Sequence, residues 1–252
     1  MFEVLNQRPF EDECVEHSKT YLATAPSEFV DAFHWSDSLL GHLYQFSCCR
    51  WGCHGKEHVF EYLGGRKVSH ALASSRLIST GYYDEAISLV RSIGEIANLL
   101  NLFHADNETI RRWLDADKNL RRTEFSPVAV RKKLEKLDWM IPFDKEHYAR
   151  LCEAVVHPTP TTMPNAYESQ LRPVLGAYFQ KEGFVQSSWE LFWAIPLVAG
   201  PIAKLAIFPE IQSRKMIDLT IPLSKLAAHQ LNERGKQNPT TATPSNPPAK
   251  SK

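Results

Sequence analysis

Residues 81–103 read GYYDEAISLVRSIGEIANLLNLF, and apolar side chains recur in this stretch at steps of three and four positions. That period places them along one side of an α-helix, as in a helix with a single buried face. The members of this apolar stripe are Ala86, Val90, Ile93, Ala97 and Leu100. The stretch predicts a long core helix and therefore favours a helical fold.

The segments around this helix show the same period. Residues 67–79 form a second apolar run with little β-branching, and Ser79-Thr80-Gly81 is typical of a turn between antiparallel helices. Alternating patterns occur only in short runs, so the expected class is all-α, an antiparallel helical bundle. Further helices are predicted at 108–122, 127–139, 144–157, 166–182, 188–205 and 210–233, the last interrupted near Pro222.

Two regions depart from the helical pattern. Residues 41–66 combine glycines with aromatic residues and cysteines, which indicates either a loop-rich insert or a broken pair of helices. The tail 235–252 has no large apolar residue and is rich in proline and threonine, so it is expected to be disordered. We therefore expect a single all-α domain over residues 1–234, followed by a disordered tail.

Composition limits the class of protein. Of the 252 residues 43% are apolar and 23% are charged, which is typical of a globular chain. Basic and acidic residues both number 29, so no global charge excess indicates a polyanionic partner. The N-terminal residues lack a secretory pattern, and the apolar stretch 191–203 would rise only ~20 Å as a helix, too short to cross a bilayer. Five cysteines in such a chain indicate reduced thiols, so we expect a cytoplasmic protein without a membrane partner.

Charge is distributed unevenly along the chain. Residues 111–136 contain nine bases against four acids, with aromatic residues between them, a pattern that suits a nucleic-acid backbone. The alternative is a pair of solvated helix faces, lying against the acidic segment 1–40. The predicted nucleic-acid contacts are Arg111, Arg112, Arg121, Arg122, Arg131, Lys132 and Lys133.

A first candidate catalytic site lies in the sequence RLCEAVVH, residues 150–157. Seven residues advance ~700° around a helix, so Arg150 and His157 share one face two turns apart, with Glu153 between them. Histidine transfers protons near neutral pH, and arginine neutralises phosphate oxygens, so the pair suits a phosphodiester. The alternative is a purely structural network of Arg150, Glu153 and His157.

A second polar group precedes it, because Arg91 and Glu95 align on one side of the helix predicted at 81–103. The sequence Tyr83-Asp84-Glu85-Ala86, then Arg91-Ser92-x-x-Glu95, then a helix ending Val156-His157-Pro158, resembles a family of uncharacterised helical bacterial proteins. That family is similar in layout to HEPN-type domains, whose signature is an arginine, four to six residues and a histidine. The resemblance covers about residues 67–160.

The resemblance implies a HEPN-like, metal-independent RNA endonuclease or RNA-binding protein that works as a homodimer. Such RNases often belong to toxin–antitoxin and phage-defence systems, so RNA and an antitoxin or other partner protein are the implied partners. The implied catalytic residues are Arg150 and His157, with Glu95 and Arg91 as further polar members. The alternative function is a non-enzymatic helical interaction protein.

Cysteine and histidine are concentrated in residues 48–58. Thiolates and imidazoles are good zinc ligands, but no Cys-x-x-Cys pair is present, so the main expectation is no metal and no cofactor. A zinc-stabilised regulator is a weaker alternative, and its ligands would be Cys49, Cys53, His54 and His58.

Overall fold

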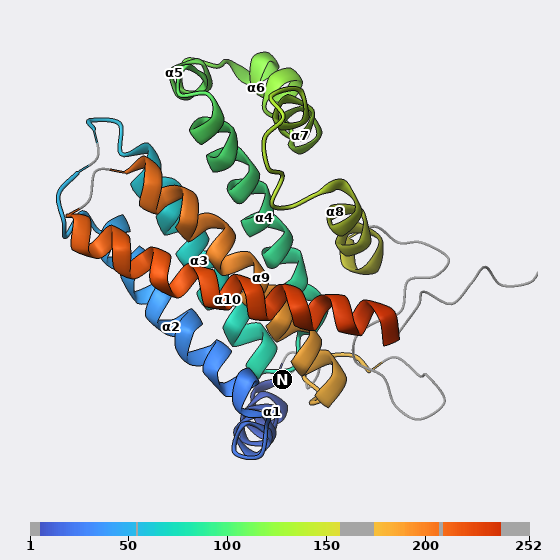
Figure 1. Cartoon of the computed structure of the whole chain (residues 1–252). Coiled ribbons are helices and arrows are strands. Elements are labelled where there is room, and N and C mark those ends of the chain that lie inside the picture. The colour runs from blue at the N-terminus through green and yellow to red at the C-terminus, as the bar shows by residue number, and fades with distance from the viewer. Residues whose placement is uncertain (1–5, 54, 157–173, 207–208, 238–252) are drawn as a thin grey trace, which may run out of the picture.

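The computed structural model describes residues 6–53, 55–156, 174–206 and 209–237. Every regular element within these ranges is a helix, which confirms the all-α class (Figure 1). The helices are α1 (Arg8–Leu22), α2 (Ser27–Ser47), α3 (Val59–Ser79), α4 (Tyr83–Ala105), α5 (Glu108–Leu114), α6 (Lys118–Glu124), α7 (Pro127–Lys136), α8 (Lys145–Leu151), a π-helical turn η2 (Cys152–Val156), α9 (Lys181–Leu205) and α10 (Glu210–Gln237).

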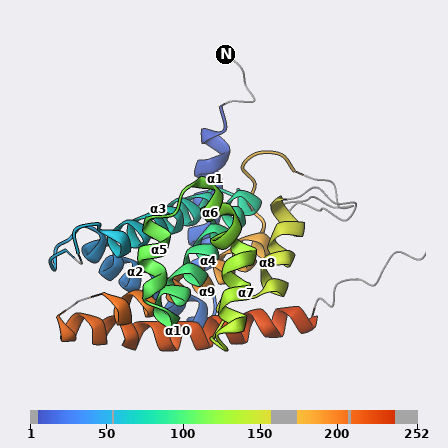
Figure 2. The ribbon, with the colours of Figure 1, turned by 90° about the horizontal axis from the view of Figure 1, so that it is seen from above.

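Helix α4 is the centre of the core, as its apolar stripe predicts. It packs between α3 and α9, and α10 lies along α9 and also contacts α2. Figure 2 shows α10 on one outer side of the molecule, with α9 between it and α4. The five stripe residues of α4 are all fully buried, namely Ala86, Val90, Ile93, Ala97 and Leu100.

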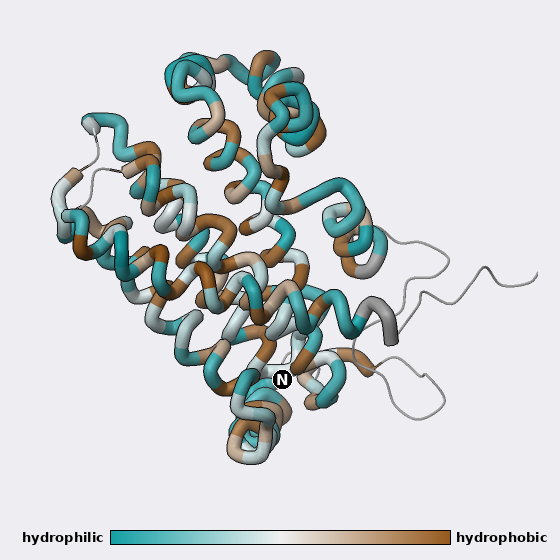
Figure 3. The backbone as a smooth tube through the Cα atoms, viewed as in Figure 1, coloured by the Kyte–Doolittle hydropathy of each residue, from teal (hydrophilic) through white to brown (hydrophobic). Residues whose placement is uncertain are grey.

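Hydropathy follows this arrangement. Apolar residues concentrate on the inner helices, whereas hydrophilic residues predominate along α5, α6 and α7 (Figure 3). By length and composition α4 could span a membrane, but 61% of its apolar window is buried inside the molecule. This burial is consistent with the core helix of a soluble protein.

The region 41–66 is a broken pair of helices, one of the two alternatives that its sequence indicates. Helix α2 extends to Ser47 and α3 begins at Val59, so the irregular part is the α2–α3 connection, residues 48–58. The glycines Gly52 and Gly55 have φ values of 98° and 76° and make the chain turn there. Helices α1 and α2 have no counterpart in the sequence prediction.

The predicted helix 108–122 is two short helices. Asp117 interrupts it, since its side chain accepts a hydrogen bond from the Leu120 amide at 2.7 Å and caps the start of α6. The predicted helix 166–182 is wrong over residues 174–180, which are irregular up to Lys181, and its first part lies outside the described residues.

The predicted interruption near Pro222 is also wrong, because α10 continues through that residue. Helix α9 likewise contains Pro196 and Pro201. Packing of α10 on α9 and α2 outweighs the hydrogen bond that a proline cannot donate. Helix α10 includes residues 235–237 of the predicted tail, and residues 238–252 lie outside the described part.

A lysine side chain is completely enclosed by this packing. Lys67 of α3 is 0% exposed, and its Nζ donates a 3.0 Å hydrogen bond to the Ile195 carbonyl of α9. Burial in the core holds the pKa of Lys67 well below its ordinary value, because the charged form loses its hydration.

Candidate functional site

Helix α8 is fixed against α4 by a backbone clamp. The Asn98 side chain donates to the Phe143 carbonyl at 2.7 Å and accepts from the Phe143 amide at 3.0 Å. Gly94 lies directly beneath the Phe143 ring, where a Cβ would come within 2.5 Å of ring carbons. Asp144 then caps α8 by accepting a hydrogen bond from the His147 amide at 2.7 Å. The polar residues of α8 are therefore held in defined positions on the core.

The first polar group on α8 surrounds a buried carboxylate of α9. Glu190 is 0% exposed, and its Oε2 lies 2.7 Å from His147 Nε2. Its Oε1 lies 3.1 Å from Arg150 Nη1, outside the angular range of a directed hydrogen bond. Arg150 Nη2 lies 3.4 Å from both ring nitrogens of His147, so it faces the ring rather than one lone pair. A carboxylate, an imidazole and a guanidinium are thus in contact.

The charge state of Glu190 follows from these contacts. Burial on its own would raise the pKa of this carboxyl. The hydrogen bond from His147 and the positive charges of His147 and Arg150 outweigh burial, and the pKa of Glu190 is lowered. Glu190 is therefore an anion held inside the protein by its contacts with His147 and Arg150.

The second polar group lies on the α4 side of α8. Arg91 Nη1 is 3.1 Å from Glu95 Oε1 and donates to the Tyr148 hydroxyl at 2.9 Å. The Tyr148 hydroxyl in turn lies 3.3 Å from Glu95 Oε1. The Arg131 guanidinium of α7 lies 4.4 Å from the centre of the Tyr148 ring. Burial and the nearby Glu95 raise the pKa of Tyr148, which keeps its phenol protonated as a hydrogen-bond donor.

Glu95 also reaches a cleft between α3, α4 and α7. The cleft has a volume of about 280 Å³, and Arg66, His70 and Ser92 are its other polar residues. Burial, together with the charge of Arg66, lowers the pKa of His70, so this imidazole is neutral near pH ~7. The apolar lining consists of Ile96, Leu99, Phe125, Pro127 and Val130. The cleft combines a cation, a neutral imidazole and a carboxylate.

Sequence reasoning missed two of these groups. Arg66 and His70 are four residues apart on α3, a spacing that places them on one helix face. This spacing can be read directly from the sequence. Gly64 and Gly65, directly before Arg66, weaken the helical pattern, so the sequence predicts this helix only from residue 67.

The residues predicted to form one catalytic site occupy two sides of α8. Arg91 and Glu95 form an ion pair with each other, and Arg150 pairs with Glu190 instead. His157 lies outside the described residues, so its position relative to Arg150 stays a prediction.

The predicted nucleic-acid contacts differ in their surroundings. Arg111 pairs with Asp115 at 2.8 Å, and both Arg112 and Lys133 pair with Glu124. Hydrogen bonds from Arg112 and Lys133 lower the pKa of Glu124 to about 2. Arg131 is only 6% exposed, packed on Tyr148. The exposed remainder is Arg121, Arg122 and Lys132.

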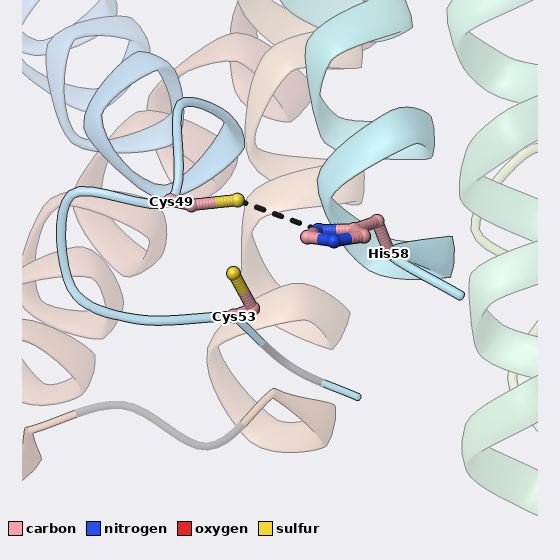
Figure 4. Close-up of side chains that lie close together, drawn as sticks. All are labelled: Cys49, Cys53 and His58. Carbon is pink, nitrogen blue, oxygen red and sulfur yellow. Dashed lines mark hydrogen bonds between the residues drawn. The ribbon is translucent and has the colours of Figure 1, made fainter. Parts of the chain in front are cut away.

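The α2–α3 connection brings together three of the four residues named as alternative metal ligands. The side chains of Cys49, Cys53 and His58 point toward one another (Figure 4), and their ligand atoms all lie within 4.8 Å of each other. Cys49 Sγ and His58 Nδ1 are 3.5 Å apart. His54 lies outside the described residues. This is a group of side chains that could hold a metal ion.

Comparison with known proteins gives no relative: no family model, curated protein or solved structure matches the chain. The class that the fold and sites define is therefore an all-helical protein with a polar cleft and a separate cysteine–histidine group.

Proposed function

We propose that the protein is a HEPN-like RNA-binding protein that cleaves RNA without a metal ion. The observation that carries the proposal is the cleft between α3, α4 and α7, in which Arg66, His70 and Glu95 line one open space. A cation that neutralises phosphate and an imidazole that transfers protons are the groups that phosphodiester chemistry requires. The resemblance of residues 67–160 to HEPN-type proteins supports the same activity.

We infer a path for the RNA from the position of α7. Phe125 and Pro127 line the cleft, so the strand would pass from the cleft onto the hydrophilic surface of α6 and α7. The exposed cations Arg121, Arg122 and Lys132 would contact its phosphates there. Cations already paired with a carboxylate, such as Arg112, would contribute less.

The proposed chemistry is attack of the ribose 2′-hydroxyl on the adjacent phosphorus, with the 5′-oxygen of the next nucleotide leaving. In the cleft, His70 would take up or deliver the proton and Arg66 would stabilise charge on the phosphorane. The resemblance implies the same roles for His157 and Arg150. The Arg150 side chain is 49% exposed, so its guanidinium can contact solvent while it pairs with Glu190. A homodimer would bring two Arg150/His157 pairs together. Cytoplasmic location, a role in defence and an antitoxin partner belong to the same proposal.

The test is incubation of the purified protein with a mixed RNA pool in EDTA. The wild type is expected to produce fragments that end in 2′,3′-cyclic phosphate. His70→Ala, in the cleft, and His157→Ala should each lower the rate at least ~100-fold, the usual contribution of one acid–base group. The matched control is His229→Ala, since His229 is exposed on α10 and should be dispensable. Equal cleavage by His70→Ala and wild type would remove the cleft as the site of cleavage, and equal cleavage by His157→Ala would remove the role of the Arg150/His157 pair.

A second function is favoured by the burial of Glu190. Because Arg150 and His147 neutralise a carboxylate that is 0% exposed, their contacts also suit a structural network in a non-enzymatic interaction protein. In that case no cleavage occurs, and Arg150→Ala lowers the thermal midpoint. Cleavage that is lost in His157→Ala with an unchanged thermal midpoint would exclude this alternative.

A further inference from the structure

We propose that Cys49, Cys53 and His58 bind a zinc ion that ties the end of α2 to the start of α3. The inference does not depend on the proposed RNA chemistry, because the three residues lie in the α2–α3 connection and none of them lines the cleft. The two thiols and one imidazole converge on one point in space (Figure 4).

The spacing of the ligand atoms suits tetrahedral zinc. Zinc–sulfur and zinc–nitrogen bonds of about 2.3 and 2.0 Å place a sulfur and a nitrogen ligand about 3.5 Å apart. The separation of Cys49 Sγ and His58 Nδ1 is 3.5 Å. The remaining pairs lie within 4.8 Å, and the Cys53 side chain, which is exposed, has room to rotate toward the other two ligands. The ligands therefore need little rearrangement.

The backbone holds the ligands in this arrangement. Cys49 and His58 both have left-handed backbone conformations, with φ of 54° and 48°, which residues with a Cβ adopt rarely. The Cys49 amide donates to the Phe46 carbonyl at 2.9 Å, and the His58 carbonyl accepts from the Tyr62 amide at 2.9 Å. One ligand is thus anchored to the last turn of α2 and another to the first turn of α3. Such rare backbone conformations persist only where the surrounding structure imposes them.

The donor set selects the metal. Thiolates and imidazoles suit zinc, whereas magnesium and calcium take oxygen ligands. The group consists of two sulfurs and one nitrogen, and the exposure of Cys53 gives solvent access to the fourth tetrahedral position. We therefore assign a zinc site with three protein ligands and water in the fourth position, the pattern of zinc sites that keep an open coordination position.

The first experiment uses the full-length wild type. After removal of metal under reducing conditions, Co²⁺ is titrated into the protein as a spectroscopic substitute for zinc. The expected result is one equivalent bound, with a sulfur-to-cobalt charge-transfer band and tetrahedral d–d bands that disappear when Zn²⁺ is added. Absence of the charge-transfer band would overturn the proposal, and so would a Cys49–Cys53 disulfide in protein isolated with reductant present.

Variants then assign the ligands. Cys49→Ser, Cys53→Ser and His58→Gln are each expected to lose stoichiometric Co²⁺ and Zn²⁺. The matched control is Cys48→Ser, which removes an exposed thiol of the same connection that is not a member of the group. Far-ultraviolet circular dichroism checks that each variant is folded. One equivalent of zinc in the Cys49→Ser/Cys53→Ser double variant would overturn the site. Because the RNA assay is performed in EDTA, failure of either proposal leaves the other testable.

Discussion

The protein contains two histidine groups that are built in opposite ways. His147 meets a carboxylate 43 positions away in the sequence, and its side chain is only 14% exposed. His58 meets sulfurs that lie five and nine positions before it, in a connection open to solvent. The first histidine receives its partner when the core forms. The second is assembled locally, and its three donors fit an ion from solution. The difference separates a group that stabilises the fold from a group that we propose binds a zinc ion.

The largest expected effect is the loss of the His147–Glu190 contact. His147→Ala leaves Glu190 buried with Arg150 as its remaining cationic neighbour. Removal of one partner from a buried ion pair costs about 3–5 kcal/mol, so the urea midpoint should fall strongly. The measurement is equilibrium urea unfolding followed by circular dichroism. A loss below about 1 kcal/mol, the range of exposed ion pairs, would show that the pair behaves as a surface contact.

The same contact should make stability depend on pH. The pKa of Glu190 is lower in the folded protein than its ordinary value, so its contribution is complete above the unfolded pKa and is lost as pH falls through the folded pKa. The stability difference between wild type and Glu190→Gln should therefore shrink between pH ~5 and pH ~2. A difference that grows on acidification would contradict this sign.

An intermediate effect is expected where α8 is attached to α4. Gly94→Ala would place a Cβ 2.5 Å from the Phe143 ring, and overpacking of this kind costs about 1–3 kcal/mol. The matched control is Gly41→Ala in α2, where a Cβ meets no atom within 4 Å. That substitution should stabilise the helix by about 0.5–1 kcal/mol. Thermal unfolding of both variants measures the difference, and equal midpoints would mean that Phe143 moves freely away.

The smallest effect is expected in the α2–α3 connection without metal. Cys53 is exposed, so Cys53→Ser in EDTA should change the free energy of unfolding by no more than about 0.5 kcal/mol. With free zinc 100-fold above its dissociation constant the wild type should gain about 2.7 kcal/mol and the variant should not. Parallel urea titrations in EDTA and in zinc measure both values. An equal gain in the two proteins would place the metal elsewhere.

The sequence predicts the core helix well and the first helices poorly. Periodicity identifies α4 because every residue of its stripe is fully buried. Helix α1 is largely polar and gives no comparable stripe. Helix α2 does carry one at steps of three and four, a signal that the sequence displays but that the prediction omits; its members are Phe29, Ala32, Ser36, Leu39, Leu43 and Phe46. Pro222 shows a different error. A proline favours a break in the helix, but α10 continues through it because of packing that the sequence does not display.

The candidate site likewise contains one ion pair that the sequence predicts and one that it does not. The Arg91–Glu95 pair follows from helical spacing and is present as an ion pair. The pairing of Arg150 with Glu190 joins segments that are distant in the sequence, and no local spacing predicts it. One signal was available, because Glu190 is the sole charged residue between positions 183 and 203. A single charge in so apolar a helix indicates a buried partner.

The enclosure of Lys67 has a consequence for chemical labelling. An amine whose pKa is lowered is more often neutral and hence more nucleophilic, yet this Nζ is sealed between α3 and α9 and bonded to the Ile195 carbonyl. An acylating reagent reaches Lys225, which is exposed on α10, in the native molecule. It reaches Lys67 only in molecules whose helices have separated. The ratio of the two labels would report how often the bundle opens.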